Sequence, residues 1–317
     1  MTRDELEDPR ATYRQGLHWV ALFAAVVTWP LICVGGSVTT YRVGLAVPDW
    51  PTTFNANMFL YNFWNAPFGV RVEHTHRLYG AAVGLATIVL TGWFLAAERR
   101  RSMKVLGVLA LLAVIGQGAL GGLRVTRTST LLAAVHGVTG QAFFALMVSL
   151  CVLTGRDWVT TTSRTADPSH LRRRAAVTLG LVAAQVVAGA WLRHFASNAA
   201  LAVHATLAAA VWSHAALLSW RVERLRAAVP ALVPSARAMA LAVTLQVVLG
   251  VAAWWVSPRP EQVVTIAQAM IRTGHQANAA LLLASAVVLM LRATRHLTAP
   301  EPSAGRRPSS LDLESVA

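Results

Sequence analysis

The chain has 317 residues, of which 55% are hydrophobic and 13% are charged, and its mean hydropathy is +0.50. This composition excludes an ordinary soluble domain, in which about a quarter of the residues are charged. The formal net charge of +14 would suit a nucleic-acid partner, but the charged residues lie in short clusters between long apolar runs. We therefore predict an all-α polytopic membrane protein whose surroundings are the lipid bilayer.

Eight apolar runs are long enough to cross a membrane as helices. With the N-terminus inside, 20 of the 28 basic residues fall in segments on the inner side. This positive-inside bias predicts that both termini are cytoplasmic, that the protein resides in the cytoplasmic (inner) membrane, and that no nucleic acid is bound. The runs are 19–36, 78–97, 105–123, 131–154, 175–192, 199–220, 238–256 and 266–291.

The longest predicted connection is the first outer loop, residues 37–72. Glycines and prolines break regular structure there. Its many aromatic residues suit either a lid or a loop that lies on the membrane surface without a catalytic role. The polar residues 1–15 lack the pattern of a signal peptide. The tail 298–317, rich in proline, serine and charge, is predicted to be a disordered cytoplasmic segment.

An internal repeat organises the eight runs. A glutamine near the end of one run is followed by a histidine near the start of the next, 19 residues later in two copies and 29 later in a third. A fourth, degenerate copy lacks the glutamine and consists of Val34-Gly35-Gly36 in the first run and a histidine at the start of the second. Four such hairpins predict two pseudo-repeated four-helix bundles, residues 1–160 and 161–297. The pairs are Gln117 and His136, Gln185 and His204, and Gln246 and His275, and the lone histidine is His76.

The four repeated histidines share one depth, near the outer surface, because all four open runs that pass from outside to inside. Two histidines that face each other across a four-helix bundle can hold a haem iron from both sides. Pairing within each half joins His76 to His136 and His204 to His275, which predicts two haem positions. A zinc or copper site needs three or four converging donors, and a lone histidine more commonly hydrogen-bonds a neighbouring helix.

Haem propionates need cations or water near the membrane surface. Several arginines lie at the level of the histidines and can supply the positive charge that fixes the orientation of the ring. These candidate cofactor-binding residues are Arg77, Arg124, Arg127, Arg193 and Arg272.

Glu73 breaks the symmetry of the repeat. It lies three residues before His76, and no acidic residue occupies that position before the other three histidines. A carboxylate in an apolar pocket beside a haem can move protons; alternatively, it pairs with Arg71 or Arg77. The asymmetry suggests that the first half performs chemistry and the second half passes electrons.

Three motifs accompany the repeat: Glu73-x-x-His76-Arg77, Gly44-Leu45-x-x-Pro48-Asp49-Trp50-Pro51 and His275-Gln276. With the eight predicted helices, they resemble the haem A synthase family over residues 17–295. The resemblance implies oxidation of a methyl group of haem O to the formyl group of haem A, for the assembly of terminal oxidases. It also implies a catalytic role for Glu73, a substrate pair at His76 and His136, and a haem b pair at His204 and His275.

The family resemblance further suggests, as partners, a membrane enzyme that produces haem O and an electron donor that the sequence does not identify. One feature departs from some family members, which carry a cysteine pair in the first outer loop, whereas residues 37–72 contain no cysteine. Two alternatives remain at this stage: a two-haem b-type electron carrier without substrate chemistry, and a haem-binding assembly protein.

Overall fold

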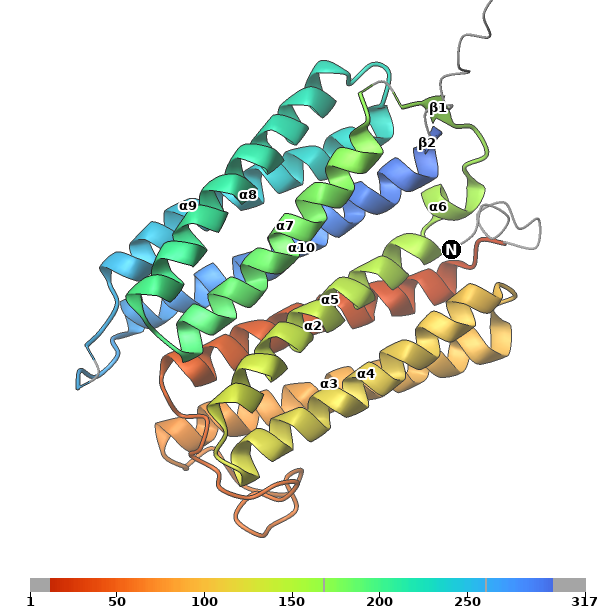
Figure 1. Ribbon diagram of the computed structural model, residues 1–317. Helices are drawn as coiled ribbons and strands as arrows, with labels where there is room; N and C mark the ends of the chain where they lie inside the picture. Colours follow the sequence, from red (N-terminus) through yellow and green to blue (C-terminus); the bar gives the residue numbers. More distant parts are fainter. Residues whose placement is uncertain (1–11, 168, 260, 299–317) are drawn as a thin grey trace, which may run out of the picture.

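The computed structural model describes residues 12–167, 169–259 and 261–298 of the chain (Figure 1). Within these residues, eight helices are long and apolar enough to cross a membrane, which confirms the predicted helical membrane architecture. The predicted disordered tail lies outside the described residues, apart from residue 298. The eight helices are α2 (Gln15–Thr40), α3 (Phe68–Ala97), α4 (Arg101–Thr126), α5 (Thr130–Thr154), α7 (Leu171–His194), α8 (Asn198–Arg224), α9 (Val233–Trp255) and α10 (Ile266–His296).

Minor elements lie at the end of the bundle opposite to the long loop (Figure 1). They are the short helix α6 (Arg156–Thr160), the 3-10 turn η1 (Pro230–Leu232), and two short strands, β1 (Thr165–Ala166) and β2 (Leu297–Thr298). The strands pair in parallel, so the connection between the two halves is tied to the end of α10.

The helices extend beyond the apolar runs that predict them, most of all α3. This helix begins at Phe68, ten residues before the predicted start at Leu78, so the first outer connection is 41–67 rather than 37–72. A prediction from apolar runs ends a helix at the first charged residue, so it misses the start of α3. The helix continues because Glu73, His74 and Arg77 all have partners within the protein.

Side-chain caps mark the start of three helices at the end of the bundle that carries the long loop 41–67. The hydroxyl groups of Ser129, Ser197 and Thr265 accept hydrogen bonds from the first turns of α5, α8 and α10. In α10, Gln268 bonds back to the cap and completes a capping box. These caps satisfy amides that a helix start otherwise leaves unpaired.

The helices pack as two groups, α2 to α5 and α7 to α10, each with its own apolar core (Figure 1). The groups meet through α2 and α5 on one side and α7 and α10 on the other. More than half of the apolar window of α10 is buried, the largest share of any helix of membrane length in the described part of the chain. The equivalence of the groups as sequence repeats stays a prediction.

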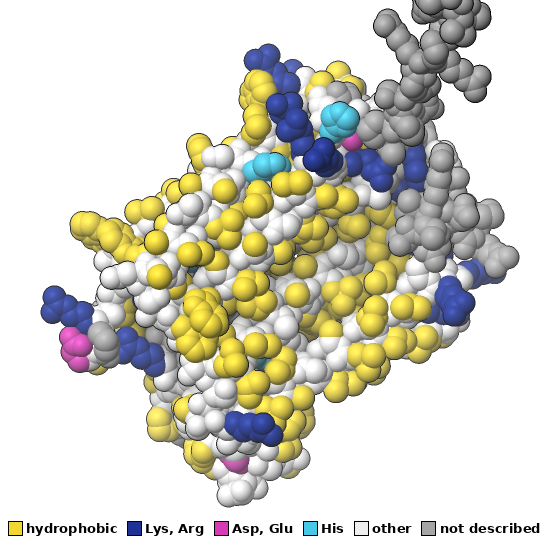
Figure 2. Space-filling model, viewed as in Figure 1, with side chains coloured by type: hydrophobic (Ala, Val, Ile, Leu, Met, Phe, Trp, Pro, Cys, Tyr) yellow, Lys and Arg dark blue, Asp and Glu magenta, His cyan; other side chains and the backbone are white. Residues whose placement is uncertain are grey.

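The flank of the molecule is apolar, as a protein in contact with lipid requires. Figure 2 shows hydrophobic side chains across the middle of the bundle and Lys and Arg side chains gathered toward its ends. Large side chains such as Trp19, Phe23 and Leu112 are more than half exposed on helices of membrane length. A bilayer would cover them.

Candidate functional site

The structure brings the four repeated histidines together in two pairs. His76 of α3 faces His136 of α5, with ring centroids 6.3 Å apart and ring planes at 89°. His204 of α8 faces His275 of α10 at the same 6.3 Å, with planes at 80°. Each pair lies within one half, as the sequence predicts.

The spacing of both pairs fits one metal between two imidazoles. A metal–nitrogen bond is about 2 Å long, and a nitrogen lies about 1.1 Å from its ring centre, which places the two centroids about 6 Å apart. In the described part of the chain, no group of three or more His, Cys, Asp or Glu side chains can hold a metal ion. A metal with two protein ligands needs further donors, and the four nitrogens of a porphyrin provide them.

A glycine on the neighbouring helix lies against every one of the four rings. A β-carbon added at these glycines would lie 2.9–3.3 Å from the Cε1 atom of the histidine, tighter than ordinary van der Waals contact. We call these contacts glycine seats. Sequence patterns did not predict them, although Gln-x-x-x-Gly recurs at 117–121, 185–189 and 246–250. The contacts are Gly35 with His76, Gly121 with His136, Gly189 with His204 and Gly250 with His275.

The two ring nitrogens of each histidine lie at different distances from the glycine. Measured from the glycine position, Nδ1 is nearer than Nε2, at 3.3 Å against 3.7 Å for His76 and 3.5 Å against 3.9 Å for His204 and His275. Nδ1 of His76, His136 and His204 is buried and makes no well-aligned hydrogen bond within the described residues. Nδ1 of these rings therefore lies nearer to the glycine, and Nε2 lies farther from it.

The repeated glutamines behave differently in the two halves. In the first half, Gln117 donates to Thr139 Oγ1 at 2.6 Å, away from the ring of the nearby histidine. In the second half, the amide of Gln185 lies 3.4 Å from His204 Nε2 and that of Gln246 lies 3.2 Å from His275 Nδ1. The second pair thus has a polar amide beside each ring.

Glu73 lies one turn before His76 and is 1% exposed. Its Oε2 accepts a hydrogen bond from the backbone amide of Val47 at 2.9 Å, and its Oε1 accepts one from Arg77 Nη2 at 3.0 Å. Arg77 also donates to the backbone carbonyls of Val47, Asp49 and Thr52 at 2.7–3.0 Å. The ion pair therefore holds the first outer loop onto the start of α3.

The loop itself is folded around Asp49. Its carboxylate accepts hydrogen bonds from the hydroxyl of Thr52 at 2.5 Å and from the backbone amides of Phe54 and Asn55 at 2.8 Å. Partial burial raises the pKa of Asp49, but these hydrogen bonds outweigh that effect and bring the pKa down to about 2. The loop therefore has a defined, hydrogen-bonded conformation and is not a solvated linker.

The loop lies over the first histidine pair. The Trp50 ring packs against Gly122, the residue after the glycine that seats His136. His74 is fully buried beneath the loop, where its Nδ1 lies 3.2 Å from Thr53 Oγ1 and its ring lies 4.7 Å from that of Phe63. These two contacts indicate that His74 packs the loop against the start of α3.

The arginines predicted near the first pair have unequal surroundings. Arg124 donates to the Gly44 carbonyl at 3.2 Å. Its guanidinium lies close enough to His76 and His136 to interact electrostatically with both rings. Arg77 has both Nη atoms engaged by the loop, as described above. Arg127 is exposed at the end of α4. Arg124 is therefore the cation best placed for an anionic group at this pair.

The arginines near the second pair lie at the junction of the two halves. Arg193 of α7 donates to the Gly36 carbonyl at 2.9 Å and to Thr40 Oγ1 at 2.7 Å, both on α2. Arg193 lies close enough to His275 and Arg272 to interact electrostatically with both. Arg272 donates a hydrogen bond to Ser257 Oγ at 2.9 Å. Arg193 thus crosses from the second half to the first.

Consecutive glycines on α2 connect the two sites. Gly35 seats His76, and a β-carbon at Gly36 would meet the amide oxygen of Gln276 at 3.2 Å. Gln276 follows His275 directly. In the sequence, Gly35 and Gly36 stand out only as part of the degenerate fourth copy of the repeat. The pair of small residues is the signal that both sites approach α2.

Comparisons with known proteins show which family this chain resembles. The model of the COX15-CtaA family, described as cytochrome oxidase assembly protein, matches residues 18–203. A protein named Heme A synthase from Granulibacter bethesdensis is 32% identical over 146 residues, 44% of this chain and 37% of that protein. A second, from Shewanella oneidensis, is 24% identical over 189 residues, 55% of this chain and 56% of that protein.

The chain thus spans between about a third and just over half of the length of these two relatives. The family match ends one residue before His204, so it contains the first histidine pair, Glu73 and the outer loop. The predicted family is confirmed. Because the match covers more than half of its length, the chain belongs to the COX15-CtaA family of cytochrome oxidase assembly proteins.

Proposed function

We propose that this protein is a haem A synthase that oxidises a methyl group of haem O to the formyl group of haem A. The observation that carries the proposal is the difference between the two pairs. Both have the spacing of an iron site, but only the first has a buried carboxylate one turn away and a folded loop above it. The names of the two relatives support the same activity.

The first half is proposed to hold haem O between His76 and His136, and the second half to hold haem b between His204 and His275. Bound haem supplies the redox chemistry in both halves. Arg124 would bind a propionate of the first haem, with Arg77 and Arg127 as the weaker candidates given their contacts. Arg193 and Arg272 would serve the second haem. The electron donor is a separate partner, and the enzyme that produces haem O is another.

Glu73 is proposed to handle a proton beside the methyl group that is oxidised. It is buried, it already exchanges hydrogen bonds with a loop amide and an arginine, and a shift of Arg77 would leave one oxygen available. The surrounding side chains exclude water, which strengthens the effect of a single charge. The same contacts give Glu73 a second role, as an anchor of the loop.

The proposed orientation places the histidine pairs toward the outer side of the cytoplasmic membrane, with both termini in the cytoplasm. The distribution of the basic residues supports this orientation. The folded loop 41–67 is then on the outer side, and the strand pair β1–β2 is on the cytoplasmic side.

The test is Glu73→Gln, produced in a membrane that also makes haem O. Glutamine keeps an acceptor for the Val47 amide but loses the negative charge, so haem should stay bound while haem A formation stops. The extracted haems are separated by chromatography. Haem A formed at the normal rate by this variant would contradict the catalytic assignment.

A two-haem electron carrier is the second candidate, because the identical 6.3 Å spacing of the pairs suits two equivalent bis-histidine haems. An electron carrier would hold two haem b groups tightly and leave haem O unchanged. Extraction of the haems from the unaltered protein, with His76→Ala as the control, separates the two functions.

A further inference from the structure

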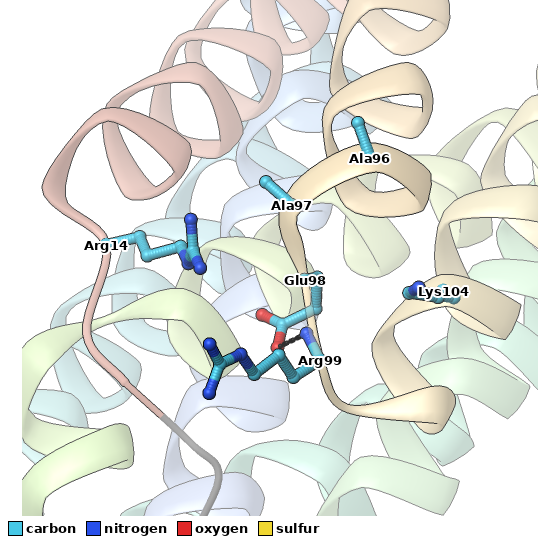
Figure 3. A pocket seen from close by; sticks show the side chains of 6 residues that line it. All are labelled: Arg14, Ala96, Ala97, Glu98, Arg99 and Lys104. Atoms are coloured by element: carbon cyan, nitrogen blue, oxygen red, sulfur yellow. Dashed lines mark hydrogen bonds between the residues drawn. The ribbon is translucent and has the colours of Figure 1, made fainter.

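A polar pocket of about 580 Å³ lies at the end of the first half, far from the histidine pairs. Figure 3 shows Arg14 and Arg99 on one side of Glu98 and Lys104 on the other. Arg14 precedes α2, and the other polar residues belong to the turn from α3 to α4 and to the first turn of α4. The lining residues are Arg14, Ala96, Ala97, Glu98, Arg99 and Lys104.

The one acidic side chain in the pocket is already neutralised. Glu98 forms a salt bridge with Arg100 at 2.8 Å, and both side chains are 6% exposed. Burial raises the pKa of Glu98, but hydrogen bonds and charge from Arg100 outweigh it and hold the pKa below its usual range. Glu98 therefore stays ionised and committed to Arg100.

The three remaining cations have no acidic partner among the described residues. Arg14 and Arg99 are exposed and Lys104 is half-buried, and none of the ion pairs in that part of the chain includes them. Three like charges around one hollow repel each other unless an anion lies between them. The pocket thus has a net charge that favours a multiply hydrogen-bonded anion.

The surroundings place the pocket at the boundary between lipid and water. The Trp93 ring packs against Gly16 at the start of α2, and Trp93 and Trp19 are 39% and 57% exposed. Tryptophan is enriched at the level of lipid headgroups. The exposed aliphatic and aromatic surface of α2 and α3 continues from the pocket toward the middle of the bilayer.

We propose that this pocket binds a phosphate group, as carried by the headgroup of an acidic phospholipid in the inner leaflet. Arg14, Arg99 and Lys104 would hold the phosphate oxygens, and the acyl chains would lie beside Trp19 and Trp93. Basic pockets between membrane helices on the cytoplasmic side commonly take headgroups of this kind. Neither the histidine pairs nor the proposed oxidation requires this site.

The test measures the phosphatidylglycerol retained by the purified full-length protein, by native mass spectrometry after extraction from phosphatidylcholine bilayers that contain it. The unaltered protein should retain the lipid. Arg14→Gln, Arg99→Gln and Lys104→Gln should each lower the affinity about fivefold, the equivalent of about 1 kcal/mol per charge near a membrane surface. The triple variant should retain none.

A matched control removes three exposed or half-buried cations at the same end of the helices but outside the pocket: Arg156→Gln, Arg172→Gln and Arg173→Gln. Equal loss of lipid from this control would overturn the proposal, because net charge alone would explain the binding. A charge-preserving variant, Arg14→Lys with Arg99→Lys, should still retain the lipid and shows that the fold is intact.

Two further arms identify the source of the anion. If inorganic phosphate displaces phosphatidylglycerol at equal concentration, the pocket serves a soluble phosphate compound; lipid that resists phosphate establishes the headgroup. Residues 1–11, outside the described part of the chain, contain four acidic residues. Lipid that binds only after Asp4→Asn, Glu5→Gln, Glu7→Gln and Asp8→Asn would show that the pocket is closed to lipid in the intact chain, and would overturn the proposal.

Discussion

The two histidine pairs share their frame and differ in what surrounds it. In each half, two rings lie 6.3 Å apart and each ring rests on a glycine of the neighbouring helix. Around the first pair are Glu73, Arg124 and a folded loop; around the second are the amides of Gln185 and Gln246. The shared arrangement of rings and glycines supports the proposed iron site in each half, and the different surroundings support the proposed oxidation in the first half.

Removing a ligand from each half gives the largest effect and separates the halves. His76→Ala should abolish haem A formation and leave the second haem in place, since the four histidines lie on four different helices. His204→Ala should remove the second haem, about half of the total, with haem O still bound in the first half. Haem content per protein and the absorption spectrum measure both. Loss of both haems from either variant would mean that the pairs are not independent sites.

The ion pair beneath the loop should be the strongest structural difference between the halves. Arg77→Ala leaves Glu73 buried without its partner, which costs about 3–5 kcal/mol for a pair this deeply buried. The loop 41–67 should then open, and limited proteolysis should cut there before it cuts elsewhere. Arg226→Ala is the control, because its pair with Glu223 is largely exposed and its loss should leave stability and proteolysis nearly unchanged.

The glycine seats give a smaller effect that is expected to be equal in the two halves. Gly121→Ala and Gly250→Ala place a methyl group 3.3 Å and 3.0 Å from a histidine ring. Each change should displace the ring and weaken haem binding about tenfold, as changes beside metal ligands commonly do. Haem titration followed by absorbance measures the loss.

The controls for the seats are glycines directly beside the same histidines. Gly137 and Gly274 have open space where a β-carbon would lie. Gly137→Ala and Gly274→Ala should leave haem affinity unchanged and, through helix propensity, stabilise the helices by up to about 1 kcal/mol. Equal losses at seats and controls would show that the glycines matter for helix packing and not for the rings.

Much of this arrangement could be predicted from the sequence. The eight apolar runs and the 19-residue interval from Gln117 to His136 and from Gln185 to His204 predicted the helices and the pairing of the histidines. The interval is informative because 19 residues lead from the last turns of one helix, through a short connection, into the first turns of the next helix. The start of α3 could not be predicted by hydropathy, since its first ten residues are held by contacts with a loop that hydropathy does not describe.

The loop contacts were the main feature that sequence patterns did not predict. The sequence singled out Glu73, but the bond from its carboxylate to the amide of Val47 joins residues 26 apart through an irregular segment. The same holds for Arg193 and Gly36, which are 157 residues apart. Such contacts depend on how two helix groups dock, and no local periodicity encodes that.

The smallest expected effect concerns pH and the loop alone. The pKa of Asp49 is about 2 in the folded protein, below the value of about 3.9 for a free side chain. A lowered pKa means that Asp49 contributes its full stabilisation above about pH 4 and loses it as the pH falls toward 2. Loop order should therefore be constant from pH 8 to pH 5 and decrease below pH 4.

Fluorine NMR of fluorotryptophan-labelled protein, with the Trp50 signal assigned by Trp50→Phe, reports that change, because the Trp50 ring packs on Gly122. Asp49→Asn should remove the transition between pH 4 and pH 2, since an asparagine does not titrate in that range. The connections at the same end of the second half, 195–197 and 256–265, are much shorter than 41–67, so haem bound there should keep its absorption spectrum while the Trp50 signal changes. A parallel change at both sites would show that the halves respond to acid as one unit and that the loop is not the titrating element.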